Sequence, residues 1–198
     1  MRGLLAKYIQ IVDAISERLG WLSMFIVVIT VIIGFFNVVA RYSGRFIGMQ
    51  LSSNVLIETQ WYLYSLVFFF GFAYILKHGI NVRVDFIYAK WPKERKAKLD
   101  FWGHLFFLVP FCIMAIWVTI NPVLTSWGQR PNGTWGTWEL SPDPSGLPRA
   151  PIKSMIIVAF VLLLLQTIAE LIKLWDVAHG QDIDLEELGS SEAPIRIE

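Results

Sequence analysis

Few side chains in this sequence could do chemistry, and the most informative is a carboxylate beside an apolar segment. Glu58 lies about one helical turn inside an apolar run, and Arg41 ends the apolar run before it, with the short link "SGRFIGMQLSSN" between them. The two charges are therefore expected at similar depth on consecutive helices. A carboxylate inside a membrane is costly unless it faces protein, water or a counter-ion. Two interpretations remain open: Glu58 pairs with Arg41, within the chain or across a subunit boundary, or it extends alone to the polar interface.

Other reactive groups are scarce. The sequence shows no nucleotide-binding loop, metal-ligand cluster or nucleophile arrangement, and Cys112 is its one cysteine. His78 and His104 lie near the ends of apolar segments and could ligate haem in a helical bundle, as in quinone-reducing membrane anchors. We keep a haem- or quinone-associated anchor subunit of a respiratory enzyme as the alternative function. We otherwise expect no enzyme activity, no cofactor, no metal and no nucleic-acid partner.

The composition requires a membrane. Of the 198 residues, 55% are hydrophobic and 17% charged, and the apolar residues form blocks rather than alternating with polar ones. Each block approaches the roughly 20 residues that cross about 30 Å of hydrocarbon. The first block is too long for the apolar core of a secretory signal, which is about 7–15 residues. We predict an all-α integral membrane protein with four transmembrane helices plus amphipathic interfacial helices. The expected spans are 21–41, 55–77, 99–121 and 152–175, within a single membrane domain over 1–176.

The basic residues predict the orientation. Lys and Arg concentrate in the segment between the second and third spans, namely Lys77, Arg83, Lys90, Lys93, Arg95, Lys96 and Lys98. Loops rich in Lys and Arg stay in the cytoplasm. We therefore expect a multi-pass protein with both termini cytoplasmic, an external loop over 122–151, and an acidic, flexible cytoplasmic tail over 177–198.

Several local features refine these elements. Residues 1–20 have an amphipathic helical pattern, typical of a helix in the headgroup region or against a partner, and 80–91 resemble a second interfacial segment. Gly79 is expected to cap the second helix, Pro92 to open a new one, and Pro122 to help stop the third span. Glu170 and Lys173, three residues apart, are expected to pair on one helix face. Gly71 and Ala73 offer a small-residue patch for close helix contact.

The external loop is long and carries Trp127, Trp135 and Trp138. About thirty residues without helical periodicity indicate a functional or disordered segment, and interleaved tryptophans argue against disorder. Two hypotheses stay open, an aromatic cap resting on the membrane interface and a docking surface for an external protein.

Three stretches carry a family resemblance: "NVVARY", "IETQWYLYSLVFFFGFAYILKHGINVRVD" and the tryptophan-bearing loop followed by "PRAPIKSM". Over roughly residues 20–175 the chain resembles the small membrane (Q-type) subunit of tripartite ATP-independent periplasmic (TRAP) transporters. Position by position, Arg41 and Glu58 match the base and acid of that family's outer-leaflet pattern. The end of its second-helix signature is matched by Gly71, Gly79, Arg83, Val84 and Asp85. Asn81 departs from the pattern, since the family often has His there.

The resemblance implies a function. The chain would be the small permease subunit, in a bacterial inner membrane, of a sodium-coupled, binding-protein-dependent secondary transporter for organic acids, serving as scaffold for a large elevator-type subunit. Its implied partners are that large polytopic membrane subunit, a periplasmic substrate-binding protein and membrane lipids. Arg41, Glu58, Gly71, Arg83 and Asp85 would make contacts between helices or subunits, and the three loop tryptophans would meet the binding protein.

Overall fold

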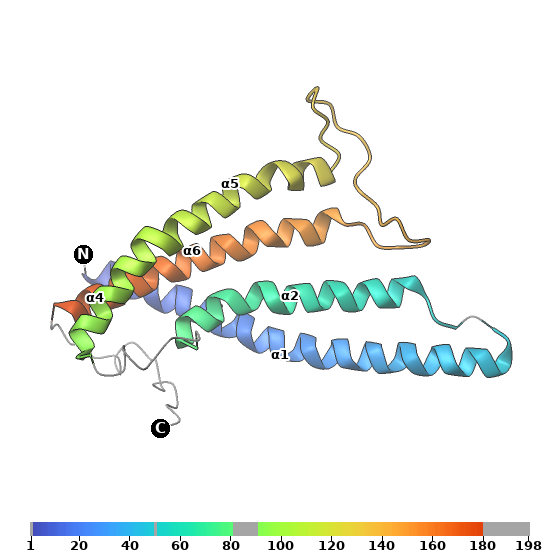
Figure 1. Ribbon diagram of the computed structural model, residues 1–198, viewed down its shortest axis with the longest axis horizontal. Helices are drawn as coiled ribbons and strands as arrows, with labels where there is room; N and C mark the ends of the chain where they lie inside the picture. The colour runs from blue at the N-terminus through green and yellow to red at the C-terminus, as the bar shows by residue number, and fades with distance from the viewer. Residues whose placement is uncertain (1, 50, 81–90, 180–198) are drawn as a thin grey trace. The chain divides into compact units, whose positions relative to one another are not determined.

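A computed structural model describes residues 2–49, 51–80 and 91–179, and regular structure there is dominated by helices (Figure 1). The elements are α1 (Arg2–Ile47), α2 (Asn54–His78), α4 (Lys93–Gly103), the π-helical turn η1 (His104–Leu108), α5 (Val109–Ser126) and α6 (Ala150–Ala178). Within the described ranges, four helical runs are long and apolar enough to cross a membrane, and they are α1, α2, α4 to α5, and α6. The predicted all-α membrane fold with four spans is therefore confirmed.

The surface of these helices fits lipid better than water. In the most apolar stretch of α2 only 6% of the residues are buried, and in that of α6 the share is 28%. Large apolar side chains such as Phe35 and Trp117 stay 72% and 75% exposed. In water such uncovered apolar surface would drive association, whereas lipid chains solvate it. The chain is therefore built to be covered by hydrocarbon or by another membrane protein.

Contacts within the chain fall into two compact units, each made from parts of several helices. Unit 1 comprises residues 1–19, 72–115 and 160–198, as far as these are described, and unit 2 comprises residues 20–71 and 116–159. The two units are described separately below.

In unit 1 the start of α1 packs against α6. Ile9 and Val12 are buried with Ala169, and Tyr8 donates a hydrogen bond to the Leu165 carbonyl at 2.9 Å. The helix predicted over residues 1–20 is present, and it runs without a break into the first span, so that both belong to α1. Its buried apolar face is thus covered by α6. Gly79 ends α2 at φ +62°, as predicted, and the backbone amide of Ile80 donates to the Ile75 carbonyl.

The third span differs from the prediction at its end. We expected Pro122 to stop the helix, but α5 contains Pro122 and continues to Ser126. A proline lacks the amide hydrogen that would bond to the carbonyl one turn earlier, but it does not prevent the residues after it from continuing the helix. Beyond Pro122 the helical pattern persists, since the Trp127 amide donates to the Val123 carbonyl at 3.0 Å. The hydroxyls of Ser126 and Thr125 add bonds to the Pro122 and Asn121 carbonyls at 3.0 Å and 2.9 Å. The loop after it accordingly covers residues 127–149 rather than 122–151.

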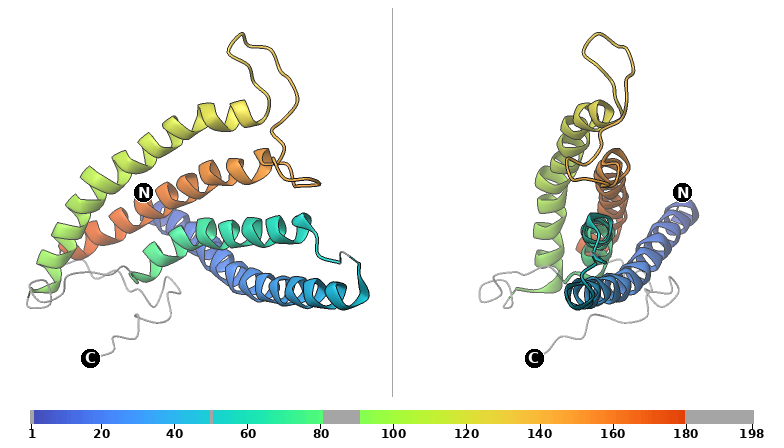
Figure 2. Two further views of the ribbon diagram at one scale, coloured as in Figure 1. Left: turned by 45° about the vertical axis from the view of Figure 1, so that its right-hand side comes forward. Right: turned by 90° about the vertical axis from the view of Figure 1, so that its right-hand side faces the viewer.

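The same run has a π-helical turn next to its other proline. η1 ends where the backbone amide of Val109 donates to the His104 carbonyl, one residue further back than in an α-helix. Pro110 follows directly and has no amide hydrogen to donate. A π-turn is one of the ordinary ways in which a helix absorbs such a defect. The path from α4 through η1 to α5 stays helical throughout, as the two views in Figure 2 show.

Candidate functional site

The clearest functional arrangement lies in unit 2, where α2 holds the loop 127–149. Glu58 is only 8% exposed, and its carboxylate accepts hydrogen bonds from the Ser141 hydroxyl and from the backbone amide of Leu147. Both donors belong to the loop. An ionised acceptor makes stronger hydrogen bonds than a neutral one. Glu58 is therefore an anchor for a loop more than eighty residues further along the chain.

Two further side chains on the same face of α2 complete this anchor. The Tyr62 hydroxyl donates to the Pro148 carbonyl at 2.9 Å, and the Asn54 amide donates to the Pro144 carbonyl at 3.4 Å. Positions 54, 58 and 62 are spaced by four residues, so their side chains follow one stripe of the helix. We call Asn54, Glu58 and Tyr62 the α2 clamp.

The loop must lack a side chain where it meets the clamp. A Cβ added at Gly146 would lie 2.3 Å from the Cβ of Ser141 and 2.9 Å from a carboxylate oxygen of Glu58. Real Cβ atoms do not approach other atoms so closely. Glycine at 146 therefore lets the backbone of the loop come near enough to reach the carboxylate.

A second carboxylate ties the loop to α5 and α6. Glu139 accepts hydrogen bonds from the Lys153 ammonium and from the Ser126 hydroxyl, the latter at 2.6 Å. Its backbone amide donates to the Ser126 carbonyl at 2.7 Å, and its carbonyl accepts from the Arg149 amide at 2.9 Å. The Lys153 hydrogen bond is the main cause that holds the pKa of Glu139 below its usual value, with help from Ser126. At neutral pH the loop is thus fastened through an ionised Glu139.

The tryptophans of the loop are arranged in two ways. Trp127 donates from its ring nitrogen to the Ser154 hydroxyl at 2.7 Å and packs against Trp138, with ring centroids 5.8 Å apart. Trp135 lies apart from this pair in a tight turn, where it bridges to Gln129, and 62% of its surface is exposed. Trp138 is 45% exposed. The loop therefore presents aromatic surface from a backbone that is fixed at several points.

The remaining predicted contact residues are placed as follows. Arg41 is exposed in α1, and in the part of the chain that the structure describes it forms no ion pair with Glu58. Gly71 is half-buried in α2, near the buried Ala73. Arg83 and Asp85 lie outside the described residues. A pair between Arg41 and Glu58 across a subunit boundary stays a prediction.

Unit 1 contains a polar network that sequence reasoning found only in part. The predicted Glu170–Lys173 pair is confirmed, with 2.9 Å between ammonium and carboxylate. The same ammonium also reaches Asp13 of α1 at 2.8 Å. Gln166, fully buried, donates to Asp13 and Glu170 and accepts from Ser16. We call Asp13, Ser16, Gln166, Glu170 and Lys173 the polar network. Their spacing on each helix could have indicated one polar face, but not which helix it meets.

A neighbouring cluster joins α1 to α2 within unit 1. Glu17 receives the Lys77 ammonium at 2.5 Å and lies 3.0 Å from the Nε2 of His78. The ring of His78 also contacts Tyr74, with centroids 4.3 Å apart. His78, one of the two histidines considered as haem ligands, thus has protein partners on both sides.

Comparison with known proteins identifies the family of the chain. The family model for tripartite ATP-independent periplasmic transporters, DctQ component, matches residues 30–177 of the chain. No curated protein and no solved structure matched. The matched region includes the α2 clamp, the loop 127–149 and the α6 side of the polar network.

Proposed function

The chain belongs to the DctQ component family of tripartite ATP-independent periplasmic transporters, and from that premise we propose that it is the fixed scaffold of its transporter. The family makes it the small permease subunit, a multi-pass protein of the inner membrane and a transporter component rather than an enzyme. Transporters of this family are tripartite, with a large membrane subunit and a periplasmic binding protein. The proposal concerns what the small subunit does for these two partners.

The scaffold role is supported by the surface of the helices. Phe25, Phe35 and Phe36 of α1 are 63%, 72% and 58% exposed, so the residues that the structure describes leave these side chains largely uncovered. Interhelical contact in a membrane depends on close packing and on polar bonds, since lipid already solvates apolar side chains. The clamp and the network supply such polar bonds inside the chain. The outer apolar faces stay available for the large subunit, which would move against this fixed support.

The observation that carries the docking part of the proposal is the fastening of the loop 127–149. Glu58, Glu139 and Tyr62 hold its backbone, which lowers the entropy lost when a partner binds. Exposed tryptophans on a preorganised surface are typical of binding hot spots. We propose that Trp135 and Trp138 contact the periplasmic binding protein, with the loop in the periplasm and both chain ends in the cytoplasm. The distribution of basic residues supports this orientation.

Sodium coupling and an organic-acid substrate complete the proposal. Their support is the resemblance to the family. In the proposed transporter both the sodium ions and the substrate are handled by the large subunit, while this chain contributes position and contact.

The proposed assembly is tested by purifying a tagged copy from its native membrane in mild detergent. Mass spectrometry should identify one large polytopic membrane protein in stoichiometric amount, and the absorption spectrum should lack a haem band. Recovery of the chain without such a partner would contradict the scaffold role. A haem band lost in His104→Ala would instead favour the alternative of a respiratory anchor.

Docking is tested in the purified complex with Trp135→Ala and a matched control. Trp117→Ala removes a tryptophan of α5 outside the loop, 75% exposed against 62% for Trp135. Trp135→Ala should weaken binding of the periplasmic protein about tenfold, because hot-spot truncations cost roughly 1–2 kcal/mol or more. Trp117→Ala should leave that binding unchanged. Equal affinity of the two variants, with the membrane complex intact in both, would refute the docking role of Trp135.

A further inference from the structure

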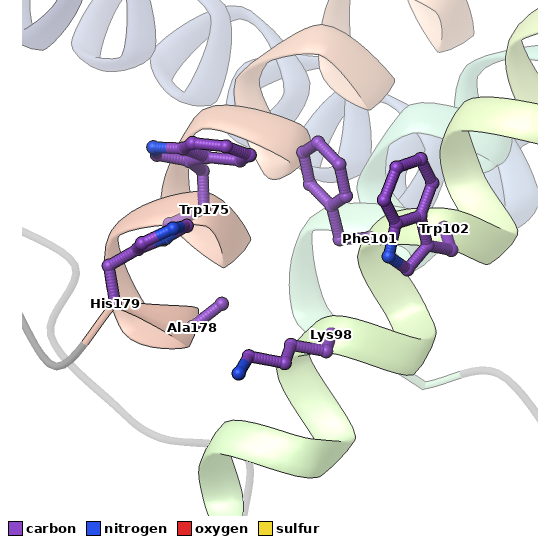
Figure 3. A pocket seen from close by; sticks show the side chains of 6 residues that line it. All are labelled: Lys98, Phe101, Trp102, Trp175, Ala178 and His179. Atoms are coloured by element: carbon purple, nitrogen blue, oxygen red, sulfur yellow. The ribbon is translucent and has the colours of Figure 1, made fainter.

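A pocket in unit 1 combines a positive charge with aromatic walls, and neither the family nor the proposed function assigns it a role. It has a volume of about 220 Å³ and is lined by Lys98, Phe101 and Trp102 of α4, by Trp175 and Ala178 of α6, and by His179, which directly follows α6 (Figure 3). The positions in each set are spaced i, i+3 and i+4, so each set lies on one face. We call it the aromatic pocket.

The walls of the aromatic pocket are a connected set of rings. Phe101 lies between Trp102 and Trp175, with ring centroids 5.5 Å and 5.4 Å away (Figure 3). The ring of His179 lies against Trp175 at 4.2 Å. Trp102 and Trp175 are each 51% exposed at the ends of membrane-spanning runs. Tryptophan favours this position because its ring suits the headgroup level of a bilayer.

The charge of the aromatic pocket is not neutralised from within. Lys98 is exposed, and among the described residues no ion pair or hydrogen bond involves its ammonium. The carboxylates nearest in sequence, Asp100 and Asp176, are not part of the lining. α4 as a whole has four basic and two acidic residues, so its field favours an anion.

His179 adds a second polar group with a defined direction. Its Nδ1 lies 2.9 Å from the Trp175 carbonyl. Because a carbonyl only accepts, Nδ1 carries the hydrogen, and Nε2 is left for a ligand. In this tautomer Nε2 accepts a hydrogen bond.

We propose that the aromatic pocket binds the phosphate and glycerol of an anionic phospholipid headgroup. Lys98 contacts the phosphate and Nε2 of His179 accepts from a glycerol hydroxyl, while the rings of Phe101, Trp102 and Trp175 cover the glycerol and the start of the acyl chains. The volume would hold roughly seven waters at about 30 Å³ each, which is more than a single ion needs. Such a lipid would tie the ends of α4 and α6 to the membrane surface.

The test is native mass spectrometry of the full chain in detergent, titrated with palmitoyl-oleoyl phosphatidylglycerol or with phosphatidylcholine of the same chains. Phosphatidylglycerol should bind more tightly. Lys98→Gln should weaken the binding of phosphatidylglycerol about fivefold, which corresponds to roughly 1 kcal/mol for one basic group near a membrane surface. The matched control is Lys93→Gln, an exposed lysine of the same helix outside the pocket, and it should change binding less than about twofold.

Two further arms make the result decisive. Trp175→Leu should weaken the binding of phosphatidylglycerol although Lys98 is intact. Circular dichroism checks that each variant keeps its helices. Soluble glycerol 3-phosphate, which has the same charged group without acyl chains, should fail to displace the lipid. Equal losses in Lys98→Gln and Lys93→Gln, no preference over phosphatidylcholine, or displacement by glycerol 3-phosphate would each overturn the proposal.

Discussion

Gln166→Leu is expected to destabilise the chain strongly, because the fully buried Gln166 makes three hydrogen bonds. It donates to Asp13 at 2.9 Å and to Glu170 at 3.0 Å, and it accepts from Ser16 at 2.7 Å. Hydrogen bonds between helices in membrane proteins average about 0.6 kcal/mol and reach about 1.7. Two of these bonds have ionised acceptors and belong at the upper end.

The expected loss in the free energy of unfolding is therefore about 3 kcal/mol, or more than about a hundredfold in the unfolding equilibrium. Leucine has nearly the same volume, so little of this loss comes from a cavity. Lys173 continues to bridge Asp13 and Glu170, which keeps the loss below that of an unpaired buried charge.

The assay is unfolding of the purified protein in mixed detergent and SDS micelles, followed by circular dichroism. Thr167→Val is the matched control: Thr167 is also fully buried on α6, but its hydroxyl donates to the Leu163 carbonyl of its own helix at 2.7 Å. Thr167→Val should lower the free energy of unfolding by less than about 1 kcal/mol. If Gln166→Leu destabilises no more than Thr167→Val, the network does not hold α1 to α6.

Two further predictions concern the loop. Gly146→Ala should speed amide exchange over residues 145–147, because the new Cβ would meet Ser141 and Glu58, at a cost of about 1–3 kcal/mol; Gly103→Ala, with open space around it, should not, and equal exchange in both would refute the close approach. The pKa of Glu139 is lowered in the folded chain. Its contribution to the free energy of unfolding is therefore complete above the unfolded-state pKa of about 4.3 and is lost as the pH falls through the lower folded-state pKa. The protection factor of the Arg149 amide, which corrects for slower intrinsic exchange at low pH, should fall in that acidic window, and in Glu139→Gln it should show no such step; a step that persists in the variant would assign the titration to another group.

Local features were well predicted because they depend on neighbours in sequence. The Glu170–Lys173 pair lies within one turn of a helix, and the cap at Gly79 depends on the conformation of that residue alone. The end of the third span was misjudged for the converse reason. Ser126, where α5 ends, donates to the carboxylate of Glu139 and accepts from the backbone amide of Glu139, and this contact with the loop is not evident from the residues next to Pro122.

The α2 clamp shows the limit of reasoning from depth. Matching depths on consecutive helices pointed Glu58 toward Arg41, yet within the chain its carboxylate meets Ser141 and Leu147 of the loop. Depth fixes a position along the membrane normal and leaves the direction around the helix axis open. The sequence left open whether Glu58 pairs or extends alone to the interface, and its observed partners depend on the path of a long loop.

The sequence by itself determined that this chain has four apolar helices, where each lies, and to which family its motifs belong. These follow from hydrophobic runs and from residue order, which need no contact between distant parts. Only the tertiary structure decided that Asp13 meets Lys173, that Glu58 holds the loop, and that Lys98 and Trp175 share a pocket. Such pairs are separated by about 80 to 160 residues, and an apolar helix surface has the same composition whether it faces lipid or protein.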